Sequence, residues 1–351
     1  RDLVIKCTLV WRTPMSLYTL AINAFAFVLV PVAIILIGHG GDPVVVISDM
    51  FLYVLITPVI ALSIMRCAYL SQDFFLCGEA IRRLEGLTET APLPTVETTL
   101  EPKGYSVSLE DVSFRYEGAK EDAVSHVTLN VPEGKTIALV GPSGSGKTTL
   151  ARLIPRFWDT TGGRVLVGGV DVRKMSPEKL MKSVSFVFQN TRLFKTTILE
   201  NVRYGSPDAT LEEVNRAIDL SQSREILDRL PEGLDTLIGA EGTYLSGGEM
   251  QRIVLARAIL KDAPIVVLDE ATAFADPENE YLIRQALTRL TRGKTVLMIA
   301  HRLTTVRHAD SIVVMKEGAI VEEGTHDELM ERNGTYRLMW DEYQRAVAWK
   351  L

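Results

Sequence analysis

A short apolar run at residues 137–140 leads directly into Gly-x-x-x-x-Gly-Lys-Thr at residues 141–148, and a helical pattern follows. A strand, a glycine-rich turn and a helix in this order form a phosphate-binding loop, because glycines let consecutive backbone N–H groups point at one phosphate. The positive end of the helix dipole favours the same anion. This feature therefore restricts the chain to an α/β fold that binds a nucleotide by its phosphates.

The residues of this loop have separate expected roles. Lys147 is expected to reach the β- and γ-phosphate oxygens and to assist catalysis, and Thr148 to offer its hydroxyl to Mg²⁺. ATP and Mg²⁺ are therefore the predicted cofactors. The other residues expected to contact the nucleotide are Pro142, Ser143, Gly144, Ser145, Gly146 and Thr149.

A second element ends in two carboxylates. A continuous apolar run at residues 264–268 is followed by Asp269 and Glu270. Such a run is typical of a central parallel strand, and ligands bind at the carboxyl ends of these strands. Asp269 is expected to hold Mg²⁺, mostly through water, and Glu270 to act as the general base that polarises the attacking water. Behind a phosphate loop, this pair predicts hydrolysis of the nucleotide.

The amino-terminal part of the chain differs from the rest. The chain has 351 residues, and about the first 80 are strongly apolar. Residues 14–37 carry no charge and residues 44–65 carry only Asp49, so each stretch is long enough to cross a bilayer as a helix. Two such runs joined by a short turn are rare in soluble cores, which disfavours buried helices of a soluble protein.

Basic residues decide the expected orientation of these spans. They flank the pair on both outer sides, whereas the turn between the spans has none, which predicts that both outer ends are cytoplasmic. We therefore expect a multi-pass protein of the cell (inner) membrane. The predicted domains are a partial transmembrane domain at 1–88, with a cytoplasmic extension at 66–88, a linker at 89–104 and a soluble cytoplasmic domain at 105–351.

Charge and cysteine content limit the expected partners. The net charge of -6 argues against a nucleic-acid-binding surface, which usually needs a basic excess. The three cysteines have neither metal-ligand spacing nor an even number, so they indicate no metal site and no disulfide framework. A lipid membrane is the partner that the two apolar stretches predict.

The signature string Leu-Ser-Gly-Gly-Glu-Met-Gln-Arg at residues 245–252 precedes the acidic strand. With this string the chain resembles the ATP-binding cassette (ABC) family. Three further motifs of that family contain Tyr116, Gln189 and His301. The resemblance implies a transmembrane helical hairpin followed by an α/β P-loop NTPase domain with an antiparallel β subdomain and a helical subdomain. By this resemblance Tyr116 stacks on adenine.

The resemblance also assigns roles to the other motif residues. It implies that Gln189 joins Mg²⁺ and a coupling surface, and that His301 contacts the γ-phosphate and positions Glu270. Cassettes of this family hold two ATP molecules head to tail, so Ser246 and Gly248 are expected to face the γ-phosphate bound by a partner. Asp276 would belong to the loop that communicates between the two sites. Hydrolysis then needs a second half-transporter, either identical or paralogous.

Some positions depart from the family pattern. Glu249 stands where glutamine is common, and residues 239–242 lack an acid at the usual place. The string Phe-Ala-Asp-Pro-Glu-Asn at residues 274–279 resembles the branch of exporter-type transporters that takes up iron–siderophore complexes in bacteria.

Several functions remain open at this point. The hairpin and cassette resemble the C-terminal part of an exporter-type half-transporter, in which residues before Trp11 belong to an extension ending in a coupling helix. The resemblance implies a small-molecule substrate. Import of an iron–siderophore complex and export of a lipid, drug or peptide are both compatible with that architecture. A non-transport cassette ATPase acting on nucleic acid lacks such spans, and a regulator that only senses ATP has no use for Glu270 and His301.

Overall fold

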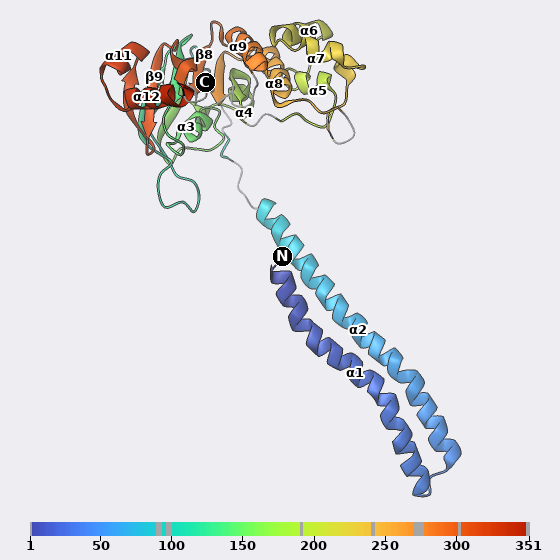
Figure 1. The fold of residues 1–351 in the computed structure, drawn as a ribbon. Coiled ribbons are helices and arrows are strands. Elements are labelled where there is room, and N and C mark those ends of the chain that lie inside the picture. Colours follow the sequence, from blue (N-terminus) through green and yellow to red (C-terminus); the bar gives the residue numbers. More distant parts are fainter. Residues whose placement is uncertain are drawn as a thin grey trace. The chain divides into compact units, whose positions relative to one another are not determined.

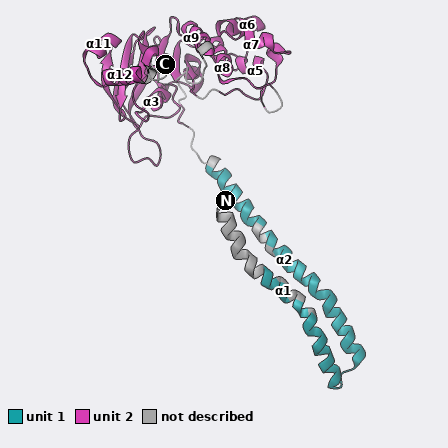
Figure 2. Ribbon diagram, in the orientation of Figure 1, with its two compact units in different colours: residues 1–92 teal, residues 93–351 magenta. Residues whose placement is uncertain are grey.

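The computed structural model describes residues 2–88, 93–95, 100–189, 192–239, 243–269, 277–300 and 303–348. The chain forms two compact units, Arg1–Pro92 and Leu93–Leu351, and the boundary falls inside the linker predicted at 89–104 (Figure 2). The described residues of the first unit are helical, whereas the second unit combines strands and helices.

The first unit is a pair of long helices, α1 (Asp2–Gly38) and α2 (Pro43–Thr88), that run side by side (Figure 1). The turn between them contains Gly40 with φ +90°, a conformation that glycine adopts without strain. The Tyr18 hydroxyl joins the two helices directly, because it donates to the carbonyl oxygen of Ala61 over 3.2 Å. The predicted hairpin is therefore present as secondary structure.

Among the described residues, one helical segment is both long and apolar enough to cross a membrane, Pro43–Cys67 with 25 residues. This segment contains the predicted second span at 44–65, and its large apolar side chains are mostly exposed, as a lipid-facing or protein-facing helix requires. A shorter apolar segment, Phe27–Gly38, lies in the region of the first span predicted at 14–37. The crossing of a membrane stays a prediction.

A six-stranded sheet forms the centre of the second unit, in the order β10, β9, β3, β8, β7, β6 (Figure 1). All neighbouring strands are parallel except β9 and β10. The strands predicted around residues 137–140 and 264–268 are β3 and β7, and both are buried almost throughout because the rest of the unit covers them. The bounds are β3 Thr136–Val140, β6 Val184–Val187, β7 Ile265–Asp269, β8 Thr295–Ile299, β9 Ser311–Lys316 and β10 Ala319–Gly324.

A second, smaller sheet is antiparallel throughout, in the order β2, β1, β4, β5. Its buried residues share one core with β3 and with the helix that follows the phosphate loop, for example Leu109 and Val165 with Leu150. The antiparallel β subdomain expected from the resemblance is therefore confirmed. Its strands are β1 Val107–Phe114, β2 Val124–Val131, β4 Gly162–Val167 and β5 Val170–Asp171.

Short helices form a third part of this unit. Buried residues of α5, α6, α7 and α8, such as Val214, Ile226 and Ile253, pack in a core of their own, which makes this the predicted helical subdomain. Other helices surround the central sheet (Figure 1). The bounds are α3 Lys147–Leu153, α4 Pro177–Ser183, α5 Ile198–Arg203, α6 Leu211–Leu220, α7 Arg224–Arg229, α8 Gly247–Lys261, α9 Pro277–Thr291, α10 Leu303–Val306, α11 His326–Glu331 and α12 Thr335–Ala348, with short 3₁₀ helices at Val172–Lys174 and Gly233–Asp235.

Candidate nucleotide-binding site

Three glycines shape the loop between β3 and α3. Gly141, Gly144 and Gly146 have φ of +149°, +78° and +94°, which residues with side chains rarely adopt. Two of them also lack room for a side chain. A Cβ at Gly141 would lie 2.2 Å from the carbonyl oxygen of Met315, and one at Gly146 would lie 2.3 Å from that of Ala123. The loop therefore requires glycine at these two positions.

Lys147 begins α3, and only 5% of it is exposed. Its ammonium donates to the carbonyl oxygens of Gly141 (3.0 Å) and Pro142 (2.8 Å) and to the hydroxyl of Ser145 (3.1 Å). These acceptors are uncharged and hold the cation beside the loop backbone. A phosphate oxygen would be a stronger acceptor for it, because hydrogen bonds between charged partners are about twice as strong as neutral ones.

The two predicted metal ligands Thr148 and Asp269 lie together, although they are 121 residues apart in the chain. The hydroxyl of Thr148 donates to Oδ1 of Asp269 over 3.1 Å. They meet because β3 and β7 are both parallel neighbours of β8, so their carboxyl ends share one edge of the sheet. A hydroxyl and a carboxylate are oxygen donors of the kind that Mg²⁺ prefers, so this pair fits the ion.

Tyr116 belongs to an aromatic group beside α3. Its hydroxyl lies 3.1 Å from the hydroxyl of Thr149. Its ring makes edge contacts with Phe114 and Trp158, at centroid distances of 4.9 Å and 5.5 Å. Sequence reasoning missed Trp158, since a single tryptophan after the loop helix matches no motif that was recognised. A half-buried aromatic group next to a phosphate loop is suited to stacking on a nucleobase.

Ser246 and Gly248 lie at the start of α8. Ser246 is exposed and caps the helix, since its hydroxyl accepts from the N–H of Glu249 (3.3 Å) while the Glu249 carboxylate accepts from the N–H of Ser246 (2.8 Å). Gly248 is buried against Asn279, where a Cβ would lie 2.7 Å from the side-chain Cγ. The glycine therefore allows the starts of α8 and α9 to approach closely.

Glu249, which stands in place of the common glutamine, has a charged partner in Arg229. Burial disfavours its charged form, but hydrogen bonds from Arg229 and Ser246 outweigh this effect and lower the pKa of Glu249. The carboxylate is therefore ionised at neutral pH and fastens the start of α8 to the end of α7.

Gln189 follows β6 and is exposed. Because β6 is the parallel neighbour of β7, Gln189 leaves the sheet at the same edge as Asp269. The described part of the chain thus gathers at one edge the phosphate loop, Asp269 and Gln189. The three predicted residues Glu270, Asp276 and His301 lie outside the described residues, and their roles stay predictions.

Sequence reasoning also missed a cavity of about 240 Å³ between β6, α8 and the end of α5. Burial lowers the pKa of both Arg257 and Lys261 in its wall. The Lys261 ammonium donates to the carbonyl oxygen of Val184 over 2.8 Å. The cavity combines cations with aromatic rings, and its lining consists of Ser185, Phe186, Val187, Phe188, Arg192, Tyr204, Gly205, Val254, Arg257, Ala258 and Lys261.

A parallel sheet with a phosphate loop after β3 and an acidic residue at the end of β7 defines the second unit as a P-loop nucleotide-binding domain. Residues 124–273 match a protein family that is described as "ABC transporter". The chain belongs to the ABC transporter family, and its second unit carries the ATP-binding cassette of an exporter-type half-transporter.

Similar proteins differ in what their names say they transport. The chain is 51% identical over 236 residues to the mycobactin import ATP-binding/permease protein IrtA of Mycolicibacterium thermoresistibile, which covers 67% of this chain and 26% of that protein. It is 47% identical over 231 residues to an ATP-dependent lipid A-core flippase of Vibrio vulnificus, which covers 66% of this chain and 40% of that protein.

A solved structure of a bacterial Atm1-family ABC exporter with ATP bound has the same fold. It matches with a TM-score of 0.69 and 33% identity, over 86% of this chain and 52% of that chain. The chain thus spans about half the length of this exporter and less than half of the two similar proteins.

Proposed function

We propose that this chain is part of an ATP-driven transporter of the cytoplasmic membrane, in which hydrolysis by a pair of cassettes powers alternating access of a transmembrane pathway. The contact between Thr148 and Asp269 carries this proposal, because it joins a phosphate loop to a carboxylate suited to Mg²⁺. The apolar segment Pro43–Cys67 supports the membrane location, with the cassette on the cytoplasmic side.

Binding of MgATP is assigned to residues at one edge of the sheet. The loop amides and the Lys147 ammonium would bind the β- and γ-phosphates, and Tyr116 would stack on the adenine ring. Thr148 and Asp269, together with Gln189, would hold Mg²⁺. Mg²⁺, when bound, neutralises charge on the phosphate oxygens and so favours attack on the γ-phosphorus.

Hydrolysis is assigned to Glu270 and His301, which follow β7 and β8 in the chain. Glu270 comes directly after β7, where it would orient a water and accept its proton as the water oxygen bonds to the γ-phosphorus. The bond between this phosphorus and the bridging oxygen breaks, which leaves ADP and inorganic phosphate. His301 follows β8 and would contact the γ-phosphate and position Glu270.

A second cassette would complete each site. The hydroxyl of Ser246 is exposed at the N-terminus of α8, a helix of 15 residues whose dipole favours an anion. Ser246 and Gly248 would therefore bind the γ-phosphate that is held by the phosphate loop of the partner. The partner is a second half-transporter, either an identical chain or a paralogue.

The cavity beside Phe188 supports mechanical coupling to the membrane. Its cations and aromatic rings fit an apolar segment that carries a carboxylate, because the apolar side chains can pack on the rings and the carboxylate can pair with the cations. In the proposed dimer, the cytoplasmic extension of the partner, equivalent to the chain before Trp11, would dock here next to Gln189.

We propose that the substrate is an iron–siderophore complex and that the transporter imports it. The string at residues 274–279 supports it, and the similar protein IrtA is named for mycobactin import. Export of a lipid, drug or peptide is the second candidate, because another similar protein is named a lipid A-core flippase. The siderophore proposal predicts that ferric siderophores stimulate the ATPase activity of the full-length transporter in lipid. Stimulation by lipids or hydrophobic drugs alone would contradict it.

The variant Glu270→Gln tests the assigned general base. In the full-length transporter it should retain MgATP binding and lower the ATPase rate by at least ~100-fold, as loss of a general base does. Nucleotide binding is measured by equilibrium titration and turnover by phosphate release. Glu280→Gln is the matched control, because Glu280 lies close by in the sequence but pairs with Arg284 on α9. A Glu270→Gln transporter with unchanged turnover would refute the assignment.

A further inference from the structure

The turn that ends α3 has an arginine in a left-handed conformation. The N–H of Arg156 donates to the carbonyl oxygen of Leu153 over 3.1 Å, and the N–H of Phe157 donates to that of Arg152 over 3.2 Å. This pair of bonds closes many helices, and glycine usually occupies the position with positive φ. Arg156 has φ +57°. Because a residue with a side chain is strained there, the arginine is expected to serve through its side chain.

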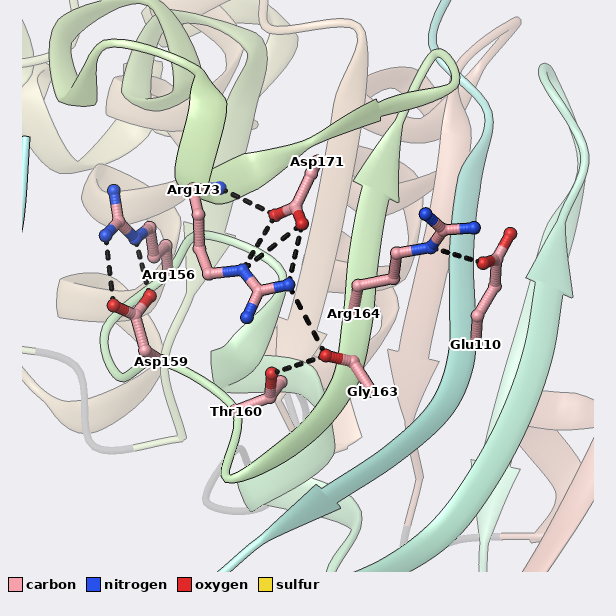
Figure 3. A network of polar contacts seen from close by, with 8 residues as sticks. All are labelled: Glu110, Arg156, Asp159, Thr160, Gly163, Arg164, Asp171 and Arg173. Atoms are coloured by element: carbon pink, nitrogen blue, oxygen red, sulfur yellow. Dashed lines mark hydrogen bonds and ion pairs between the residues drawn. The ribbon is translucent and has the colours of Figure 1, made fainter. Parts of the chain in front are cut away.

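The buried guanidinium of Arg156 joins two separate segments. Its Nε donates to Oδ1 of Asp159 over 2.6 Å, and its Nη2 donates to Oδ2 over 3.0 Å (Figure 3). The same Nη2 donates to the carbonyl oxygen of Pro94 over 2.8 Å. We call Arg156, Asp159 and the Pro94 carbonyl the linker clamp. Only 6% of the arginine side chain is exposed, so water screens the pair weakly.

The two aromatic residues inside this turn contact the nucleotide site. Phe157 stacks on Phe188 at a centroid distance of 5.9 Å, and Phe188 directly precedes Gln189. Trp158 contacts the ring of Tyr116 at 5.5 Å. The clamp is therefore connected through neighbouring residues to the predicted adenine platform, to the Gln189 segment and, through α3, to the phosphate loop.

Further hydrogen bonds fasten the linker to the cassette. The N–H of Leu100 donates to the carbonyl oxygen of Lys174 over 3.2 Å, and the N–H of Lys103 donates to that of Gly168 over 2.9 Å. In the other direction, the chain before Pro94 leads back to α2. The clamp thus holds the linker at the position where the chain leaves the cassette toward the helical unit.

We propose that the linker clamp passes the effect of nucleotide binding from the phosphate-loop helix to the linker, and through it to α2. The inference rests on the proposed function, because it takes ATP as the ligand. A nucleotide that fills the loop and stacks on Tyr116 restrains Trp158 and the end of α3, and this fixes Arg156 on Pro94. Arg156 is a positioning residue, since it contacts the linker and not the nucleotide.

Hydrogen–deuterium exchange of the full-length protein in lipid nanodiscs tests the proposal, with and without Mg²⁺ and a non-hydrolysable ATP analogue. In the wild type, the nucleotide should slow exchange both in the phosphate loop and in the linker beside Pro94, at the amides of Leu93 and Thr95. The variant Arg156→Gly removes the guanidinium and relieves the left-handed strain, so the end of α3 stays closed. Its phosphate loop should keep the nucleotide-dependent protection, and its linker should lose it.

Two further variants separate coupling from damage to the fold. Arg156→Gly combined with Asp159→Asn leaves no unpaired carboxylate and should give the same loss in the linker. Arg164→Ala is the matched control, because Arg164 on β4 pairs with Glu110 on β1 over 2.5 Å and has no described contact with Asp159 or Pro94 (Figure 3). In this control the nucleotide should still slow exchange in both the phosphate loop and the linker.

Linker protection that survives in Arg156→Gly would overturn the proposal. So would a wild-type linker that does not respond while the phosphate loop does. A wild-type phosphate loop that shows no protection would instead refute nucleotide binding, and the proposed function with it, so the two failures are distinguishable.

Discussion

Two different constraints keep single residues of the phosphate loop as glycine. Gly144 has φ +78°, but a Cβ there would meet no atom within 4 Å. Gly146 has φ +94°, and its Cβ would lie 2.3 Å from a backbone oxygen of Ala123. Backbone conformation alone constrains the first position, whereas conformation and close packing together constrain the second.

Replacement by alanine should therefore lower the free energy of unfolding by different amounts at Gly144 and at Gly146. Gly144→Ala is expected to lower the free energy of unfolding of the cassette by about 1 kcal/mol, the usual cost of a left-handed alanine. Gly146→Ala adds a backbone clash, and the cost should rise to about 3 kcal/mol or more. Urea unfolding of the two variants measures both. Equal losses would show that the contact with Ala123 relaxes freely.

At the level of single elements, capping boxes begin three of the helices whose first residues the structure describes. Ser246 with Glu249, Thr210 with Glu213, and Thr325 with Glu328 start α8, α6 and α11. Each box satisfies backbone N–H groups that the helix itself leaves unpaired. The box of α8 differs in that Arg229 also pairs with its glutamate. The start of the signature helix α8 is therefore held by charge as well as by hydrogen bonds.

The charge of Glu249 makes the stability of the cassette depend on pH, and the pKa shift gives the direction of this dependence. The folded-state pKa of Glu249 lies below its ordinary value of 4.5, so its stabilising effect is fully present above pH 4.5 and is lost as the pH falls through the folded-state pKa. Glu249→Gln keeps the cap but loses the charge. At neutral pH the wild type should exceed this variant by about 0.5–1 kcal/mol in free energy of unfolding, and the gap should close in acid.

Thermal unfolding between about pH 3.5 and pH 8 measures this gap, a range that brackets the ordinary pKa of glutamate. Glu213→Gln is the matched control, because Glu213 caps α6 without an arginine partner among the described contacts. A gap for Glu249→Gln that stays constant down to the acid end would contradict the role of the ion pair.

At the scale of the whole molecule, the signature residues and the phosphate loop belong to different elements. Ser246 is exposed at the start of α8, and its described hydrogen bonds run to Glu249. The phosphate loop lies between β3 and α3. The proposed function therefore makes two cassettes interdependent, since the signature residues of one cassette would complete the site of the other.

A dimer in the ATP-bound state follows from this arrangement. In the full-length transporter, cassettes with Glu270→Gln should dimerise when MgATP is added, and Ser246→Arg should prevent this by steric and charge conflict at the N-terminus of α8. ATP binding to the intact loop should persist. Cross-linking between the two cassettes and nucleotide titration measure the two effects separately.

The control for this experiment is Thr325→Arg. Thr325 is also exposed and also begins a helix with a capping box, so the cost of losing a cap, about 1 kcal/mol, is matched. Its ATP-dependent dimerisation should match that of the chain with Glu270→Gln alone. If Ser246→Arg dimerises as well as Thr325→Arg does, Ser246 does not lie at the interface.

Elements with local signals could be predicted from the order of the amino acids alone. The loop at residues 141–148 and the strand that ends at Asp269 are recognisable because glycine conformation and apolar continuity act between neighbours in the chain. The helical hairpin was readable for the same reason. The two subdomains were expected only from the family resemblance, and no periodicity indicated them.

The packing of the folded chain, in contrast, determines which of these elements meet. It inserted β8 between β3 and β7, and so placed Thr148 against Asp269. It also brought Trp158 to Tyr116 and Arg156 to Pro94, contacts that no local pattern encodes. Strand order and long-range side-chain contacts depend on how the whole core packs, and patterns among neighbouring residues do not predict that packing.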